Sequence, residues 1–195
     1  MGTLSRILIQ GVESATVVEL LKNHYKTGRT QNFDYEFKEV FLDQMNYSFI
    51  VFDAFLKNWT ELIVDFYSDV REHDEFLIKI SLDFQTKVIF GYEQTTLGDA
   101  KLAVWKNGNV VRSIYQKLNL EKDLIEMKEN FGHRFLNEAG FKYPVIGGDC
   151  SGFKVLDFDD IQTLFQDAGF TGEKRSNKVK EYIHLEYHKN KHTKN

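Results

Sequence analysis

The chain has 195 residues, a length at which one domain can bury a sizeable core. Its formal net charge of −4 is unevenly spread, because residues 171–195 hold seven Lys or Arg and three Glu, which leaves −8 on residues 1–170. An acidic body repels phosphate backbones, which argues against nucleic-acid binding and favours a basic partner.

The cysteine content and hydropathy point to the cytoplasm. Cys150 is the only cysteine, which excludes an intramolecular disulfide and a cluster of thiolate ligands. No segment approaches the roughly 18 consecutive apolar residues needed to cross a bilayer. The sequence "MGTLSRILIQGVESATVV" lacks the apolar run and cleavage site of a secretory signal. We therefore expect a cytoplasmic protein that does not interact with membranes.

The first part of the chain has the pattern β-α-β-β. "SRILIQGV" (5–12) predicts a strand, and the apolar spacing of "SATVVELLKNHY" predicts a helix with Ser14 as its N-cap. "YEFKEVFLD" (35–43) and "YSFIVFDAF" (47–55) are aromatic and β-branched runs separated by three polar or flexible residues. They predict a hairpin.

The same order repeats from residue 61. "ELIVDFY" alternates as a strand that places Glu61, Asp65 and Tyr67 on a water-facing side. Asp69 and Glu72 have the spacing of a capping box for a helix that continues to residue 84. "KVIFGYEQ" (87–94) and "AKLAVWKNGNVVRSIYQK" (100–117) then predict three strands. The Asn-Gly pair in the latter tolerates the positive φ angles of a type I′ turn.

The last third of the sequence predicts helices and one strand. "LEKDLIEMKENFG" (120–132) has apolar residues at helical spacing, with Asn119 as a cap and Gly132 as a stop. "LNEAGF" (136–141) and "FQDAGF" (165–170) are helix stops, and Asp157 and Asp160 favour the start of a helix over 158–168. "KVKEYIHLEY" alternates as a closing strand.

These patterns predict an α+β fold. A mostly antiparallel sheet would be built from two successive β-α-β-β units, with C-terminal helices and the closing strand completing it. We expect a single domain over residues 1–187 and a flexible basic tail over 188–195.

Three histidines have the spacing of metal ligands on a helix: His184, His188 and His192. Because this region reads as a strand and a tail, the three imidazoles would not converge. Acidic residues at 157, 159 and 160 suit the start of a helix better than acid–base or Mg²⁺ chemistry. We expect neither a metal site nor a cofactor.

The glycine-rich loop over 143–153 holds the remaining reactive side chains, Asp149, Cys150 and Ser151. It lacks the GxSxG spacing of a nucleophile elbow, and an adjacent Asp supplies neither a positioned base nor an oxyanion donor. We expect a loop that joins two helical elements and a protein that is not an enzyme.

Residues 59–170 resemble immunity proteins of bacterial polymorphic and contact-dependent toxin systems. The likeness lies in the strand pattern of "WTELIVDFYSD", "TKVIFGYEQ" and "LAVWKNGNVVRS", followed by a helix of the type "FDDIQTLFQDAGF". The resemblance implies a small, non-catalytic cytoplasmic protein that occludes the active site of a cognate toxin, often a basic nuclease.

Three functions remain open: a protein-binding inhibitor, a small-ligand-binding domain, and an enzyme with its site in the 143–153 loop. The first accounts for the acidic charge and the aromatic content together. A basic partner would be steered by exposed carboxylates and held by aromatic anchors. The residues predicted for this surface are Glu61, Asp65, Asp69, Glu72, Asp74, Glu75, Tyr67, Trp59 and Trp105.

Overall fold

The computed structural model describes residues 3–33, 47–54, 58–64, 69–94, 97–138, 143–148, 150, 156–171 and 182–188. These ranges contain nine strands and three α-helices, and every strand pair with an assigned register is antiparallel. The predicted α+β class with a mostly antiparallel sheet is therefore confirmed. The chain forms two compact units: residues 1–7 with 73–171 (unit 1), and residues 8–72 with 172–195 (unit 2).

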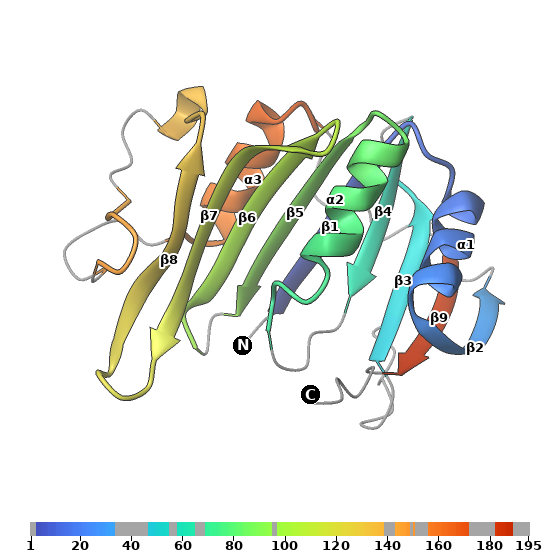
Figure 1. Ribbon diagram of the computed structural model, residues 1–195, viewed down its shortest axis with the longest axis horizontal. Helices are drawn as coiled ribbons and strands as arrows, with labels where there is room; N and C mark the ends of the chain where they lie inside the picture. The colour runs from blue at the N-terminus through green and yellow to red at the C-terminus, as the bar shows by residue number, and fades with distance from the viewer. Residues whose placement is uncertain are drawn as a thin grey trace. The chain divides into compact units, whose positions relative to one another are not determined.

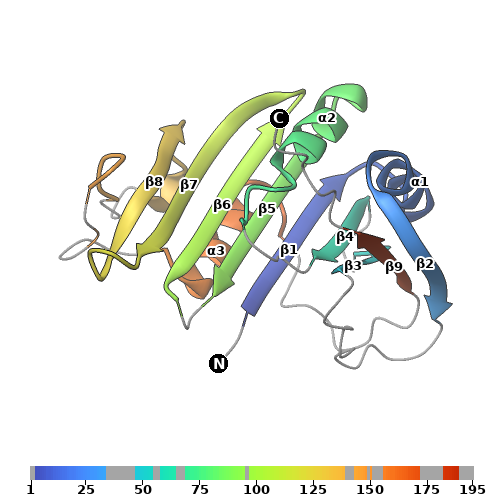
Figure 2. The same cartoon turned by 60° about the horizontal axis from the view of Figure 1, so that its bottom comes forward.

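Unit 1 contains a four-stranded meander between two helices. Its strands are β5 (Lys87–Gln94), β6 (Asp99–Lys106), β7 (Asn109–Asn119) and β8 (Leu124–Gly132), each paired with the next. Helices α2 (Asp74–Asp83) and α3 (Phe158–Asp167) lie on opposite faces of this sheet (Figures 1 and 2). A short 3-10 turn, η1 (Leu136–Glu138), follows β8.

The core of unit 1 follows from the apolar faces of these helices. α2 buries Phe76, Leu77 and Ile80, and α3 buries Ile161, Leu164 and Phe165. Each such side chain contributes roughly 1.5–3 kcal/mol on leaving water. Gly91 of β5 allows α3 to approach the sheet, because a Cβ there would overlap Ile161 and the ring of Phe165.

A buried ion pair holds the chain after β8 against the sheet. Arg112 of β7 and Glu138 of η1 are both almost fully buried, and Nη2 of Arg112 lies 2.7 Å from Oε2 of Glu138. Arg112 also donates to the main-chain oxygen of Phe131 at 2.8 Å and to the side chain of Asn130 at 2.9 Å. The charge is thus compensated and hydrogen-bonded, as burial requires.

Unit 2 places the C-terminal strand inside its sheet. The strand order is β2 (Lys26–Phe33), β9 (Tyr182–His188), β3 (Tyr47–Asp53), β4 (Trp59–Val64). Helix α1 (Ser14–His24) contacts β3, and the rings of Phe49 and Tyr187 stack 4.6 Å apart. The predicted closing strand is confirmed. β1 (Thr3–Gln10) was also predicted; its residues up to Ile7 belong to unit 1 and those from Leu8 belong to unit 2.

The predicted helix over 120–132 is wrong. Residues 124–132 form β8, which pairs with β7 from Arg112 to Asn119. Ile125 and Met127 lie opposite Leu118 and Gln116, on one side of the sheet, so the apolar pattern also satisfies a period of two. The long β7 supplies hydrogen-bond partners along this whole segment, and this pairing overrides the helical spacing.

Other local predictions were also incorrect. α2 begins at Asp74 without the predicted capping box, since Asp69 instead accepts from the backbone N–H of Arg71. α1 begins at Ser14 itself, with Glu13 in the N-cap position. Residues 136–138 form a 3-10 turn, and the Ala-Gly-Phe part of the helix stop predicted there lies outside the described residues.

The strand order does not confirm two β-α-β-β units. β2 is a strand that sequence patterns did not predict, because an edge strand with mostly exposed polar residues shows no hydrophobic alternation. The strand predicted over 35–43 lies outside the described residues. Of the tail predicted over 188–195, His188 is instead the last residue of β9, and the rest lies outside the described residues. In the described part of the chain, no helix is long and apolar enough to span a membrane.

The hairpin between β6 and β7 forms as predicted. Asn107 and Gly108 have φ angles of 53° and 78°, as a type I′ turn requires. A Cβ at Gly108 would also lie 2.9 Å from Cδ1 of Leu82 at the end of α2.

Replacing Gly108 by Val should therefore lower the free energy of unfolding by about 1–3 kcal/mol, since a β-branched residue resists positive φ. Urea unfolding of Gly108→Val measures this change. The control is Asn109→Val, one residue into β7, where φ is not positive. Equal stability of the two variants would show that the turn does not constrain the fold.

Candidate functional site

The aromatic anchors predicted for partner binding are inside the protein. Trp59 is 5% exposed and Trp105 is 3% exposed. Glu61 is 2% exposed, so the prediction that it faces water is wrong: this stretch of β4 is covered on both sides. Asp65 and Tyr67 lie outside the described residues.

The carboxylates predicted around the start of α2 are largely engaged within the chain. Asp69 binds the guanidinium of Arg71, with Oδ2 2.9 Å from Nη2. Asp74 binds the buried Nζ of Lys101 at 2.5 Å. Glu72 is half-buried and Glu75 is exposed. This cluster therefore offers less uncompensated charge than its sequence suggests.

The described part of the glycine-rich loop forms hydrogen bonds with the free edge of β8. Asn130 donates to the main-chain oxygen of Pro144 at 2.9 Å, Gly147 N–H donates to Met127, and Cys150 N–H donates to Ile125 at 2.8 Å. Residues 143–148 and 150 thus run antiparallel to β8 along its open edge. Cys150 is buried here, and the neighbouring Asp149 and Ser151 lie outside the described residues.

The histidines that suggested metal ligands lie on or beyond β9. His184 is buried, and its Nε2 is 2.8 Å from the hydroxyl of Ser48. Burial is the main cause that lowers the pKa of His184, and the charge of Arg29 adds to it. His192 lies outside the described residues. In the ranges that the structure describes, no three His, Cys, Asp or Glu side chains are grouped to hold a metal ion.

Three connections meet at one end of unit 1, where β5 and β7 end. They are the β5–β6 turn, the β7–β8 turn and the start of α3 (Figure 1). We call this surface the acidic end. Its acidic members are Glu93, Asp99, Glu121, Asp123, Asp157 and Asp159, and its exposed apolar members are Leu97, Leu120 and Phe158. Two lysines, Lys117 and Lys122, accompany them.

A buried amide joins two of these connections to β7. Gln116 of β7 donates to the main-chain oxygens of Gly98 and Leu156, at 3.0 and 3.1 Å, and accepts from Leu156 N–H at 2.8 Å. Asp99 accepts from Leu118 N–H at 2.8 Å. The turn at residue 98 and the chain entering α3 are therefore both bound to β7.

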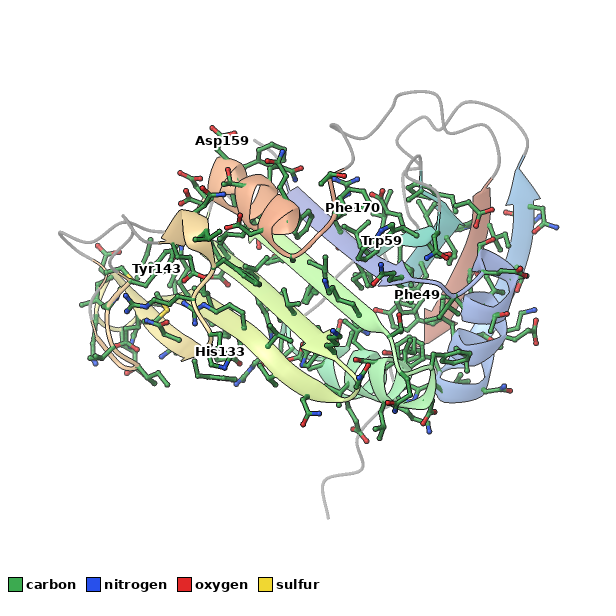
Figure 3. All side chains as sticks on the ribbon, turned by 90° about the horizontal axis from the view of Figure 1, so that it is seen from above. Phe49, Trp59, His133, Tyr143, Asp159 and Phe170 are labelled. Atoms are coloured by element: carbon green, nitrogen blue, oxygen red, sulfur yellow. The ribbon has the colours of Figure 1, made fainter. Side chains whose placement is uncertain are left out.

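Local hydrogen bonds shape the charged segments themselves. Asp157 caps α3 by accepting from Asp160 N–H at 2.8 Å, as the sequence predicts for this helix start. Asn119 accepts from the N–H groups of Glu121 and Lys122, which orders the β7–β8 turn. Figure 3 shows Asp159 on the outer side of α3.

Carboxylates at this end repel one another. Glu93 lies beside the start of α3, and its pKa is raised by desolvation first and then by the charges of Asp157 and Asp159. A hydrogen bond from the backbone of Phe158 partly opposes this rise. In the described part of the chain, no Lys or Arg forms an ion pair with these three carboxylates.

One carboxylate near this end, that of Glu126, is compensated. Lys122 and Lys128 both bind the carboxylate of Glu126, which lowers its pKa to about 2. Lys122 is thereby occupied and does not neutralise the residues around α3. Phe158 lies between Asp157 and Asp159 in the chain, and the two turns at this end expose Leu97 and Leu120, of which Leu120 is 82% exposed.

Sequence patterns missed most of this surface. Asp157 and Asp160 were recognised as a helix start, yet Glu93, Glu121 and Leu120 carry no local signal that places them together. Their proximity depends on the hairpin between β7 and β8, which the sequence predicted as a helix. Correctly reading Asn119 as a turn residue would have brought Glu121 and Asp123 to the end of the sheet.

Comparisons of the chain with protein-family models, with curated proteins and with solved structures find no match.

The repulsion at Glu93 predicts a pH-dependent effect on stability. Because the pKa of Glu93 is higher in the folded protein than in the unfolded chain, its contribution is favourable below about pH 4.3 and is lost as pH rises through the folded pKa. Glu93→Gln should therefore have a higher free energy of unfolding than the wild type at pH 7, measured by urea unfolding. The difference should be less than about 1 kcal/mol, because solvent screens the group.

The gap between Glu93→Gln and the wild type should shrink towards pH 4. Glu121→Gln, on the same end but in the β7–β8 turn, controls for the general loss of a negative charge. A gap that instead widens at low pH would contradict the proposed repulsion.

Proposed function

We propose that this chain is a non-catalytic, cytoplasmic protein-binding protein of the immunity type, which occludes a basic toxin partner. The observation that carries the proposal is the acidic end, where Glu93, Asp157 and Asp159 form no ion pair within the described residues and where Leu97, Leu120 and Phe158 are exposed. Nucleases that bind the phosphate backbone are one class of basic toxin with a complementary active site. The resemblance over residues 59–170 supports the same function.

The chemistry of the acidic end suits an inhibitor. Carboxylates at the rim accelerate encounter with a basic partner, and apolar side chains that become buried slow dissociation. An ordered surface also binds more tightly than a flexible one, because less conformational entropy is lost. The hydrogen bonds of Gln116 and Asn119 supply that order.

Loops at the end of a rigid sheet commonly carry function. The acidic end is of this kind, whereas the predicted cluster at the start of α2 has Asp69 and Asp74 already paired. We therefore place the partner at the acidic end in preference to the α2 cluster.

The test begins with the protein encoded by the neighbouring reading frame, co-expressed with this chain. A retained basic protein identifies the partner, and its association rate is then measured by stopped flow at low ionic strength. Glu121→Lys combined with Asp159→Lys should lower that rate about tenfold or more and weaken its salt dependence.

The matched control is Glu72→Lys combined with Glu75→Lys, which makes the same change in net charge at the α2 cluster. It should leave most of the rate intact. A slower rate only in this control would move the surface to α2. If a confirmed basic partner binds both variants at the wild-type rate, acidic docking is disproved.

A further inference from the structure

The opposite end of unit 1 has the opposite charge. There β5 begins, β6 and β8 end, and α2 finishes (Figure 1). We call this surface the basic end. It is formed by Lys87, Lys106, His133 and Arg134, with the exposed apolar side chains Leu82, Phe84, Val110 and Leu136. Figure 3 looks onto this end and labels His133.

The basic end is as well ordered as the acidic end. The β6–β7 turn is bound to the end of α2, since Asn107 N–H donates to Thr86 at 3.1 Å and Gly108 N–H donates to Ser81 at 3.2 Å. Asn137 binds Asp167 at the end of α3 with a 2.7 Å hydrogen bond. Leu136, next to it, is 89% exposed.

The cations of the basic end lack carboxylate partners among the described residues, although Nζ of Lys87 donates to the main-chain oxygen of Ala168 at 2.6 Å. Lys87 and Lys106 are direct cross-strand partners, and the pKa of Lys87 is lowered by desolvation and by Lys106. The nearby carboxylates have other partners, because Asp83 binds Lys79 and Asp167 binds Asn137. Over the described ranges, neither Lys87, Lys106 nor Arg134 forms an ion pair with a carboxylate.

One copy cannot bring its own two ends together. β5 runs from Lys87 at the basic end to Glu93 and Gln94 at the acidic end. At about 3.4 Å per residue, the strand separates the ends by roughly 24 Å. Direct charge pairing between them therefore requires two molecules.

We propose that the basic end binds the acidic end of a second copy of this chain, so that copies associate head to tail. Each contact pairs cations with carboxylates and covers exposed apolar side chains from both ends. Such a contact is heterologous, so it produces a ring if the rotation closes and an open chain of copies if it does not. This association uses the purified chain alone and does not depend on the proposed toxin partner.

The test is sedimentation velocity of the purified protein at low ionic strength over a wide concentration range. The weight-average mass of the wild type should rise about twofold or more with concentration. Raising the salt to about 0.15 M should reverse most of the rise, because the Debye length falls to about 8 Å. A wild type that stays monomeric at every concentration overturns the proposal.

Charge-swapped variants locate the contact. Lys106→Glu with Arg134→Glu reverses the basic end, and Glu121→Lys with Asp159→Lys reverses the acidic end. Each variant alone should remain monomeric, and an equimolar mixture should associate, because the reversed ends are again complementary.

A control variant keeps the same change in net charge away from both ends. Lys26→Glu with Arg29→Glu, on the exposed edge strand β2, should associate as the wild type does. Association of both end-reversed variants to the wild-type extent would overturn the proposal. Circular dichroism of each variant confirms that the fold is retained.

Discussion

The side-chain amide of Gln116 is the contact on which the acidic end depends. It is buried in β7, yet it satisfies main-chain groups of the β5–β6 turn and of the chain entering α3. Removing this amide would leave three main-chain groups of Gly98 and Leu156 without their hydrogen-bond partner, each at a cost of about 1–3 kcal/mol. One side chain therefore joins three segments that are distant in sequence, and it brings Glu93 within reach of the charges of Asp157 and Asp159.

Buried charge fixes the other end of the same sheet. Arg112 and Glu138 stabilise little as a pair, because desolvation offsets their attraction. Removing either partner would strand a charge, so the pair specifies where the chain turns after β8. Together with residues 143–148 and 150 along the open edge of β8, it prevents the meander from presenting an unpaired strand.

The sequence predicted those parts of the fold whose signals are local. The Asn107-Gly108 turn, β5 and the capped helix α3 need only neighbouring residues to form, and they lie where expected. β8 was misread because Ile125 and Met127 fit both a helical and a strand period, and only the presence of β7 decides between them. β2 shows no apolar alternation, because it is an edge strand whose side chains are mostly exposed and need not be apolar.

The candidate surface shows the same division between local and long-range signals. The charges at 157–160 could be recognised in the sequence as a helix start. Whether a carboxylate is neutralised by a nearby cation, however, depends on the tertiary structure. Asp69, Asp74 and Asp159 look alike in sequence, and only the fold shows that Arg71 and Lys101 neutralise the first two.

The two proposals assign two alternative partners to the acidic end. A second copy offers a basic surface at the concentration of the protein itself, and a basic toxin offers one only when it is produced. The ion pairs of a head-to-tail contact are individually weak, because an exposed ion pair contributes only about 0–1 kcal/mol. A toxin that buries more of Leu97, Leu120 and Phe158 would displace the neighbouring copy, because apolar burial adds roughly 25 cal/mol per Å². Because salt of about 0.15 M should reverse most of the self-association, the acidic end would be open to a toxin at that ionic strength and covered by a second copy only at lower salt.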